Sequence, residues 1–283
     1  MKLPTAVVEW LAQHGHGSIV SSRPAAGGCI NNGAHLETET GARFFLKTNP
    51  NAPADMFARE AEGLDALAAT RTLRVPAVSL VGEGFLLLED LRPAACAGDY
   101  WQAFGRGLAR LHTHTNPQFG FAHDNYIGST PQPNGWLADG YVFFAERRLN
   151  YQAHLAHSRD LLTTAETAAV ERLAARLPQL VPPQPASLLH GDLWAGNAIT
   201  DGAGAPALID PAAHYGWAEA ELAMTALFSS FPAEFYTAYE AERPLEPGWR
   251  GRLELYNLYH LLNHLNLFGR SYRGQVMDVL KGY

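Results

Sequence analysis

The chain has 283 residues, of which 47% are hydrophobic and 17% charged, a composition typical of a folded globular protein with room for one large domain or two lobes. The formal net charge of −7 argues against a nucleic-acid backbone as a partner, and only two cysteines argue against a disulfide framework. No apolar run reaches membrane-spanning length and no signal peptide is evident, so we expect a cytoplasmic protein with no membrane partner.

The first fifty residues predict a short helix followed by an antiparallel meander. The helix is expected over residues 3–14, and the strands begin at Ile19 and continue over 34–40 and 43–47. A Gly-rich turn from Pro24 to Gly33 joins the first two strands, and such glycines let backbone N–H groups approach phosphate closely. Its spacing is not Gly-x-Gly-x-x-Gly, so the turn alone also fits a flexible hairpin tip.

A lysine and a glutamate form the next predicted feature. Lys47 ends the third strand, from which it could reach the phosphates of a nucleotide, although strand-end lysines are often merely solvated. The following helix, which begins near residues 51–53, places Glu60 on the same face as Phe57 and Leu64. An unpaired carboxylate among apolar neighbours is costly, so we predict that Glu60 pairs with Lys47.

Two more strands, over 77–81 and 85–89, complete the predicted sheet. Glu89 and Leu91 would then lie in a hinge whose backbone could hydrogen-bond to adenine. We expect an N-lobe over residues 1–92 and a helical C-lobe over 93–283. In the C-lobe, residues 116–134 are expected to be irregular, and Thr163 with Glu166 forms a capping box. Helices are expected near 99–112, 136–157, 163 onward, 219–231, 232–242, 249–268 and 275–281.

Two polar clusters at predicted strand ends organise the C-lobe. The first is His190-Gly-Asp192-Leu-Trp194-Ala-Gly-Asn197, and the second is Asp210, which follows the apolar run 207–209. Asp and Asn can simply cap turns. However, the His-x-Asp-x-x-x-x-Asn spacing followed by a second Asp matches the catalytic loop and metal-binding Asp of kinases. Phosphoryl transfer requires a carboxylate for the attacking hydroxyl and oxygen ligands for magnesium.

The sequence resembles the fructosamine kinase (ketosamine 3-kinase) family from residue 19 to about 268. The segments that carry this resemblance are Gly28-Cys-Ile-Asn31, Phe44-Phe-Leu-Lys47, Phe119-Gly-Phe121, Asn125 with Ile127-Gly128, Gln132-Pro-Asn134-Gly-Trp136, Phe143-Phe-Ala-Glu-Arg147-Arg-Leu149, His190 to Asn197, Ile209 to Gly216, and Glu219 to Thr225. The Asp/Asn/Asp core is shared with aminoglycoside phosphotransferases and choline kinases, whereas the Leu-Trp after Asp192 and the stretch from Asp210 to Thr225 are more specific.

The resemblance implies an α+β, protein-kinase-like two-lobed fold with an antiparallel-sheet N-lobe, one key helix and a mainly helical C-lobe. It also implies ATP- and Mg²⁺-dependent phosphorylation of the sugar 3-hydroxyl of ketosamines, such as fructosamine or ribulosamine adducts. The phosphorylated adduct then decomposes, which links the family to the removal of glycation. The ketosamine partner could be a small molecule or protein-bound, and we expect a monomer or weak dimer.

Residue by residue, the resemblance assigns Asp192 as the base that orients the substrate hydroxyl, and Asn197 and Asp210 as magnesium ligands. Lys47, braced by Glu60, would hold the α- and β-phosphates. The residues expected to cover the phosphates are Gly27, Gly28, Cys29, Ile30 and Asn31.

Aromatic side chains near the two polar clusters are the candidate substrate contacts, since their faces suit the C–H side of a sugar and attract an amine cation. They are Trp136, Trp194, His214, Tyr215 and Trp217, and packing is the alternative for most of them. His214 replaces an aromatic residue of many relatives, and Gly140-Tyr141 replaces a Trp-containing segment. These departures leave the choice of substrate open.

Two alternative functions and the role of one cysteine stay open from the sequence. The chain could be an aminoglycoside or other small-alcohol phosphotransferase, or a nucleotide-binding pseudokinase, although Lys47, Asp192, Asn197 and Asp210 are all present. Cys29 could be a redox-sensitive thiol in the phosphate-covering turn or a small buried residue.

Overall fold

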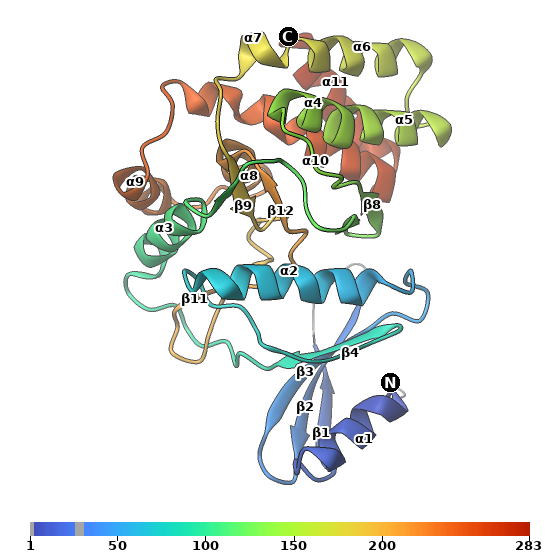
Figure 1. Ribbon diagram of the computed structural model, residues 1–283, viewed down its shortest axis with the longest axis vertical. Helices are drawn as coiled ribbons and strands as arrows, with labels where there is room; N and C mark the ends of the chain where they lie inside the picture. Colours follow the sequence, from blue (N-terminus) through green and yellow to red (C-terminus); the bar gives the residue numbers. More distant parts are fainter. Residues whose placement is uncertain (1–2, 26–30) are drawn as a thin grey trace.

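The structure, a computed structural model, describes residues 3–25 and 31–283. A β-sheet part and a helical part lie one above the other, with helix α2 (Met56–Thr70) between them (Figure 1). Within the described residues, five antiparallel strands form the larger sheet in the order β1-β2-β3-β5-β4. Their bounds are β1 Ile19–Pro24, β2 Asn32–Thr38, β3 Arg43–Thr48, β4 Val78–Gly82 and β5 Phe85–Glu89. The predicted meander is therefore confirmed.

Side-chain alternation along β3 separates the two faces of this sheet. Phe44 and Leu46 pack on the side of helix α1 (Thr5–Gln13), where they form an apolar cluster with Val7 and Leu11. Lys47 points to the opposite face, toward α2. In the sheet register, Lys47 is paired with Gly33 of β2 and with Leu86 of β5. The position of Lys47 is thus fixed from both neighbouring strands.

Helix α2 packs on the sheet through the face that its sequence spacing predicts. Phe57, Leu64 and Leu67 are buried, and the helix ends at Thr70, after which the C-cap residue Arg71 has a left-handed φ of 55°. On its other side, Gly63 lies against the helical part. A Cβ at Gly63 would lie 3.3 Å from both the Pro211 and the Ala213 side chains. The absence of a side chain at residue 63 therefore lets α2 approach the segment after Asp210 closely.

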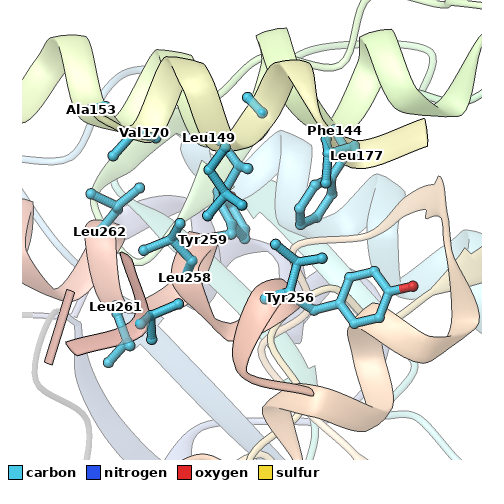
Figure 2. Packing of buried hydrophobic residues seen from close by; sticks show 14 of the residues in the cluster. Phe144, Leu149, Ala153, Val170, Leu177, Tyr256, Leu258, Tyr259, Leu261 and Leu262 are labelled. Atoms are coloured by element: carbon cyan, nitrogen blue, oxygen red, sulfur yellow. The ribbon is translucent and has the colours of Figure 1, made fainter. Parts of the chain in front are cut away.

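The helical part begins with α3. The bounds of its longer segments are α3 Tyr100–Leu111, α4 Gly140–Phe144, the π-helical segment η1 Ala145–Asn150, α5 Tyr151–Ser158, α6 Thr164–Ala175, α7 Leu177–Leu180, α8 Ala218–Met224, α9 Ala233–Glu242, the 3₁₀ segments η2 Trp249–Arg252 and η3 Arg270–Tyr272, α10 Leu253–Phe268 and α11 Arg273–Lys281. Its largest apolar cluster joins α10 to the α4–α6 region, where Tyr256, Leu258 and Leu262 face Phe144, Leu149 and Val170 (Figure 2).

Short strands complete the helical part and place the polar clusters. They are β6 Thr115–Asn116, β7 Asn125–Ile127, β8 Thr130–Gln132, β9 Ala186–Leu189, β10 Ala198–Thr200, β11 Pro206–Leu208 and β12 His214–Gly216. Strands β7 and β8 form a hairpin inside the segment 116–134, which was expected to be irregular. Asp192 follows β9, and Asp210 follows β11, as the strand-end argument predicted.

Two helix predictions need correction. The helix expected over 136–157 begins at Gly140, because the Asp139 side chain accepts hydrogen bonds from the Tyr141 and Val142 N–H groups and caps it there. It is also interrupted by the π-helical segment η1. The helix expected over 219–231 already ends at Met224. The capping box at Thr163 and Glu166 is confirmed. None of the helices in the described part of the chain is long and apolar enough to cross a membrane.

Candidate active site

An open cleft of about 800 Å³ lies between the sheet and the helical part and brings most of the predicted site residues together. Its lining includes the following predicted residues: Asn31, Lys47, Glu60, Glu89, Leu91, Asp192, Trp194, Asn197 and Asp210. Gly27, Gly28, Cys29 and Ile30 lie outside the described residues. The three segments that were expected to converge, namely β3 with α2, residues 190–197 and Asp210, do so in this cleft.

Lys47 lies between two carboxylates at the centre of the cleft. Its Nζ is 2.6 Å from Glu60 Oε1 and 3.0 Å from Asp210 Oδ1, and its side chain is only 6% exposed. Burial by itself lowers the pKa of Lys47, but the neighbouring charges of Asp210 and Glu60 outweigh it and raise the pKa above its usual value. Lys47 is therefore a fixed positive charge next to Asp210.

The Asp210 backbone has a left-handed conformation, with φ of 57°. Non-glycine residues rarely adopt this region, and Asp is among the few that tolerate it. Two backbone hydrogen bonds tie this segment to the loop after β9, from Ile209 N to Asn197 O (3.1 Å) and from Ala212 N to His190 O (2.9 Å). The two polar clusters are thus one connected unit, although Asp210 lies eighteen residues beyond Asp192.

Asp192 and Asn197 are held together within the loop after β9. The Asn197 Nδ2 donates to the Asp192 backbone O at 2.8 Å and to Asp192 Oδ2 at 3.3 Å. Burial, together with the nearby charge of Asp210, raises the pKa of Asp192 to about 7, although the hydrogen bond from Asn197 opposes the shift. A carboxylate with a pKa near neutrality is well suited to accept a proton from a hydroxyl.

A buried glutamate that was not predicted from the sequence anchors the backbone of this loop. Glu221, on α8, accepts hydrogen bonds from the backbone N–H groups of His190 (3.0 Å) and Gly191 (2.7 Å) and is 2.9 Å from His112 Nε2. Burial raises the Glu221 pKa, but the hydrogen bond and charge of His112 outweigh it and keep the pKa below its usual value. The argument applied to Glu60, a carboxylate on the apolar face of a helix, would have identified Glu221.

The hinge residues border an apolar section of the cleft. Its lining there includes Phe45, Leu88, Ile199 and Ile209, a surface that suits a flat aromatic base. The Glu89 side chain points away to Arg74 and the Ala77 N–H. No hydrogen bond among the described residues uses the Leu91 N–H, so it is available to a ligand.

Only one of the five candidate substrate contacts lines this cleft. Trp194 is 41% exposed, and its ring lies over Gly196. His214 is buried, and its Nδ1 lies 3.1 Å from Ala212 O; Trp217 is buried among Phe144, Tyr141 and Tyr256. Both side chains line a small separate cavity of about 20 Å³.

Tyr215 and Trp136 do not line the cleft either; their rings are 6.0 Å apart, and Trp136 is exposed on the surface. This arrangement does not support direct substrate contact by His214, Tyr215, Trp217 or Trp136. The pairing of β12 with β9 buries His214 and, directly after the strand, Trp217 in the helical part, whereas Trp136 lies on the surface.

Instead, where α10 borders the cleft, it is lined by aromatic residues that the sequence analysis did not select. Phe228 and Phe268 are 42% and 48% exposed, and the His264 ring lies between them at 4.6 and 5.4 Å. Tyr272 completes this group, and all four line the cleft. Exposed aromatic residues that border a cleft are unusual enough to indicate a binding surface.

The donor set fits a magnesium ion that is shared with a polyphosphate. Because Asn197 Nδ2 donates to Asp192, the amide Oδ1 is left for a cation, and the Asp210 carboxylate is 43% exposed. No group of three or more His, Cys, Asp or Glu side chains among the described residues could hold a metal ion alone. Mg²⁺ is commonly bound by one or two protein oxygens together with phosphates and waters, so two ligands suffice.

Comparison with known proteins identifies the family. The sequence model of the family described as fructosamine kinase matches residues 4–283. The chain belongs to the fructosamine kinase family. It is 44% identical over 268 residues to the "probable ketoamine kinase" of Synechocystis sp., covering 93% of this chain and 90% of that protein. It is 39% identical over 285 residues to the chloroplastic protein-ribulosamine 3-kinase of Arabidopsis thaliana, covering 97% and 86% of the two chains.

Solved structures confirm the expected two-part, kinase-like fold of this fructosamine kinase family member. A crystal structure of a fructosamine-3-kinase candidate from Thermobifida fusca has a TM-score of 0.90 at 31% identity and covers 99% of this chain and 98% of that one. An aminoglycoside phosphotransferase has a TM-score of 0.64 at 15% identity, covering 98% and 99% of the two chains, which indicates a shared fold only. Family membership confirms the prediction of an ATP-dependent phosphotransferase.

Proposed function

We propose that this protein transfers the γ-phosphoryl group of ATP to the 3-hydroxyl of a ketosamine, such as a fructosamine or ribulosamine adduct. The main observation behind this proposal is that Lys47 contacts both Glu60 and Asp210 in the cleft that Asp192 also lines. This is the arrangement that phosphoryl transfer requires, with a fixed cation for the phosphates beside a carboxylate for the metal and another for the acceptor.

In the proposed mechanism, Lys47 binds the α- and β-phosphates, and Glu60 keeps its ammonium group in place. The adenine lies against the apolar section of the cleft and accepts a hydrogen bond from the Leu91 N–H. Asn31 would border the phosphates, and Asn197 and Asp210 would hold Mg²⁺. When bound with the nucleotide, Mg²⁺ would neutralise charge on the polyphosphate.

Asp192 acts on the acceptor in this mechanism. Its carboxylate orients the 3-hydroxyl and receives its proton as the new O–Pγ bond forms and the bond between Pγ and the bridging oxygen of ADP breaks. Since the transition state is loose, positioning supplies most of the rate enhancement. Glu221 contributes by fixing the His190–Gly191 backbone.

The acceptor lies beyond Asp192, at the aromatic end of the cleft. Trp194 covers the C–H face of the sugar, and Phe228 and Phe268 border the amine-linked group. A polycationic aminoglycoside would favour acidic walls, whereas this end is built by aromatic side chains. Ketosamine is therefore the better acceptor. We also propose that the protein acts in the cytoplasm as a monomer or weak dimer, with lobes that divide near residue 92.

The test is phosphate transfer from ATP with Mg²⁺ to a panel of fructosamine, ribulosamine, an aminoglycoside and choline, followed by product analysis. We expect transfer to the ketosamines and none from the Asp192→Ala variant, which should still bind nucleotide. Transfer to the aminoglycoside alone would refute the substrate class. Full activity of Asp192→Ala would refute the assignment of the base.

A further inference from the structure

Buried amide side chains lie directly behind the segment that follows Asp210, and the proposed mechanism does not use them. They are Asn125 and Gln132 from the β7–β8 hairpin and Asn134 just after it, and each is at most 4% exposed. Burying polar groups is costly unless their hydrogen bonds are satisfied, so a fully connected set of amides indicates a requirement for a defined arrangement.

The first branch of this amide network starts at Arg148. Its guanidinium can only donate, and Arg148 Nη2 donates to Asn134 Oδ1 at 2.7 Å. Asn134 Nδ2 must then face the next residue, and it donates to Asn125 Oδ1 at 2.8 Å. Asn125 Nδ2 in turn donates to the backbone O of Ala213 at 2.9 Å. The guanidinium therefore dictates the orientation of both amides, and the branch ends in an N–H donor on a backbone carbonyl.

The second branch starts at Tyr259 on α10. Its hydroxyl donates to Gln132 Oε1 at 2.6 Å, and Gln132 Nε2 donates to the backbone O of Ala212 at 3.0 Å and to Asn125 Oδ1 at 2.7 Å. Two successive carbonyl groups, those of Ala212 and Ala213, are thus drawn into the helical part. The Ala212 N–H donates in addition to His190 O, so the backbone after Asp210 is held on several sides.

The buried charge of Arg148 indicates that this network orients its amide groups and does more than fill space. Arg148 is 1% exposed, and no carboxylate of the described residues lies within ion-pair distance of it. Burial lowers the Arg148 pKa to about 10, so the group stays charged at neutral pH. Its compensation comes from Pro133 O at 2.7 Å and from the rings of Phe143 and Tyr259, whose centroids are 4.6 and 5.6 Å away. It lies in the π-helical segment η1, and π-helical turns occur frequently at functional sites.

We propose that Asn125, Gln132, Asn134 and Arg148 are positioning residues that hold Asp210 in its left-handed conformation, facing Lys47. The left-handed backbone of Asp210 is unfavourable for a residue other than glycine and must be compensated by its surroundings. The inference rests on the proposed role of Asp210 as a magnesium ligand. It makes the binding of the magnesium–nucleotide complex depend on side chains that hold the backbone after Asp210 in place.

The experiment measures nucleotide affinity by calorimetry with and without Mg²⁺ in two variants. Asn125→Asp keeps the acceptor for Gln132 and Asn134 but loses the N–H donated to Ala213 O, and Tyr259→Phe is a gentler change that removes one hydroxyl. The matched control is Tyr256→Phe, which lies one turn earlier on α10 and removes a buried hydroxyl that contacts Glu219 and Gln184 instead.

We expect roughly tenfold weaker binding of the magnesium–nucleotide complex in Asn125→Asp and roughly threefold weaker binding in Tyr259→Phe, with metal-free affinity unchanged within about twofold. Tyr256→Phe should keep both affinities. An equal loss with and without Mg²⁺ would indicate general support of the fold and overturn the inference.

If Asn125→Asp does not fold, the test is the nucleotide affinity of Tyr259→Phe, with and without Mg²⁺, compared with that of the control Tyr256→Phe. Unchanged affinities in the variants, while the wild-type protein binds nucleotide more tightly with Mg²⁺, would overturn only this inference. If Mg²⁺ did not strengthen wild-type binding, the metal-binding role of Asp210 would fail, and the inference with it.

Discussion

Replacing Asp192 by Asn should make the protein more stable at alkaline pH while abolishing phosphate transfer. The fold raises the pKa of Asp192 from 3.8 to about 7, mainly through burial and the charge of Asp210. A carboxyl group whose pKa is raised on folding holds its proton longer in the folded state than in the unfolded state. Its contribution to stability is therefore present below about pH 4 and is lost as the pH rises through about 7.

The size of this change in stability follows from the shift in the Asp192 pKa. A shift of about three pK units corresponds to an upper limit of about 4 kcal/mol, because each unit is worth about 1.4 kcal/mol. The Asp192 side chain borders an open cleft, so solvent screening reduces this value, and we expect about 2 kcal/mol between pH 4 and pH 8. Asn has nearly the same shape and can still accept the hydrogen bond from Asn197, but it cannot ionise.

The assay is urea unfolding of both proteins at several pH values, together with phosphate transfer at pH 8. The stability difference in favour of Asp192→Asn should grow with pH and level off above about pH 7. A difference that is constant with pH, or that shrinks as the pH rises, would refute the raised pKa of Asp192. Measurable transfer by the variant would refute its role as the base.

Three further changes test the rest of the site. Glu60→Gln should weaken nucleotide binding roughly tenfold in calorimetry, because Lys47 is then held by Asp210 alone; unchanged affinity would contradict the bracing role. Glu221→Gln should lower the free energy of unfolding by about 3 kcal/mol, because an amide cannot accept from all the donors that face the carboxylate; a loss below about 0.5 kcal/mol in denaturant unfolding would count against this network. Trp194→Ala should raise the KM for a ketosamine roughly tenfold and leave the melting temperature nearly unchanged, since the side chain is exposed; an unaltered KM would remove Trp194 from the acceptor site.

The polar centre of the candidate site could be predicted from the sequence because each part has a local signal. Spacing identified the loop of Asp192 and Asn197, and a carboxylate on an apolar helix face identified Glu60 and its pairing with Lys47. The antiparallel sheet and the capping box at Thr163 followed from alternation and capping patterns in the same way.

The aromatic lining of the cleft could not be predicted in this way, because it depends on how distant elements pack. Trp217 and His214 are neighbours of Asp210 in sequence, but the pairing of β12 with β9 carries them into the core. Phe228 and Phe268 lie forty residues apart and carry no motif, and only the packing of α10 against α8 brings them to one cleft. Proximity in sequence to Asp210 was therefore a poor guide to which side chains line the cleft.

The close seating of α2 on the segment after Asp210, made possible by Gly63, gives a means of tuning the enzyme. A methyl group added at this residue would have to push apart the Pro211 and Ala213 side chains, each only 3.3 Å away, and a larger side chain would lift the helix and carry Glu60 with it. Side chains of increasing size at residue 63 would thus move α2 progressively further from the segment after Asp210. They would displace Glu60 from Lys47 step by step and so weaken the proposed binding of nucleotide, without altering any group proposed to take part in the chemistry.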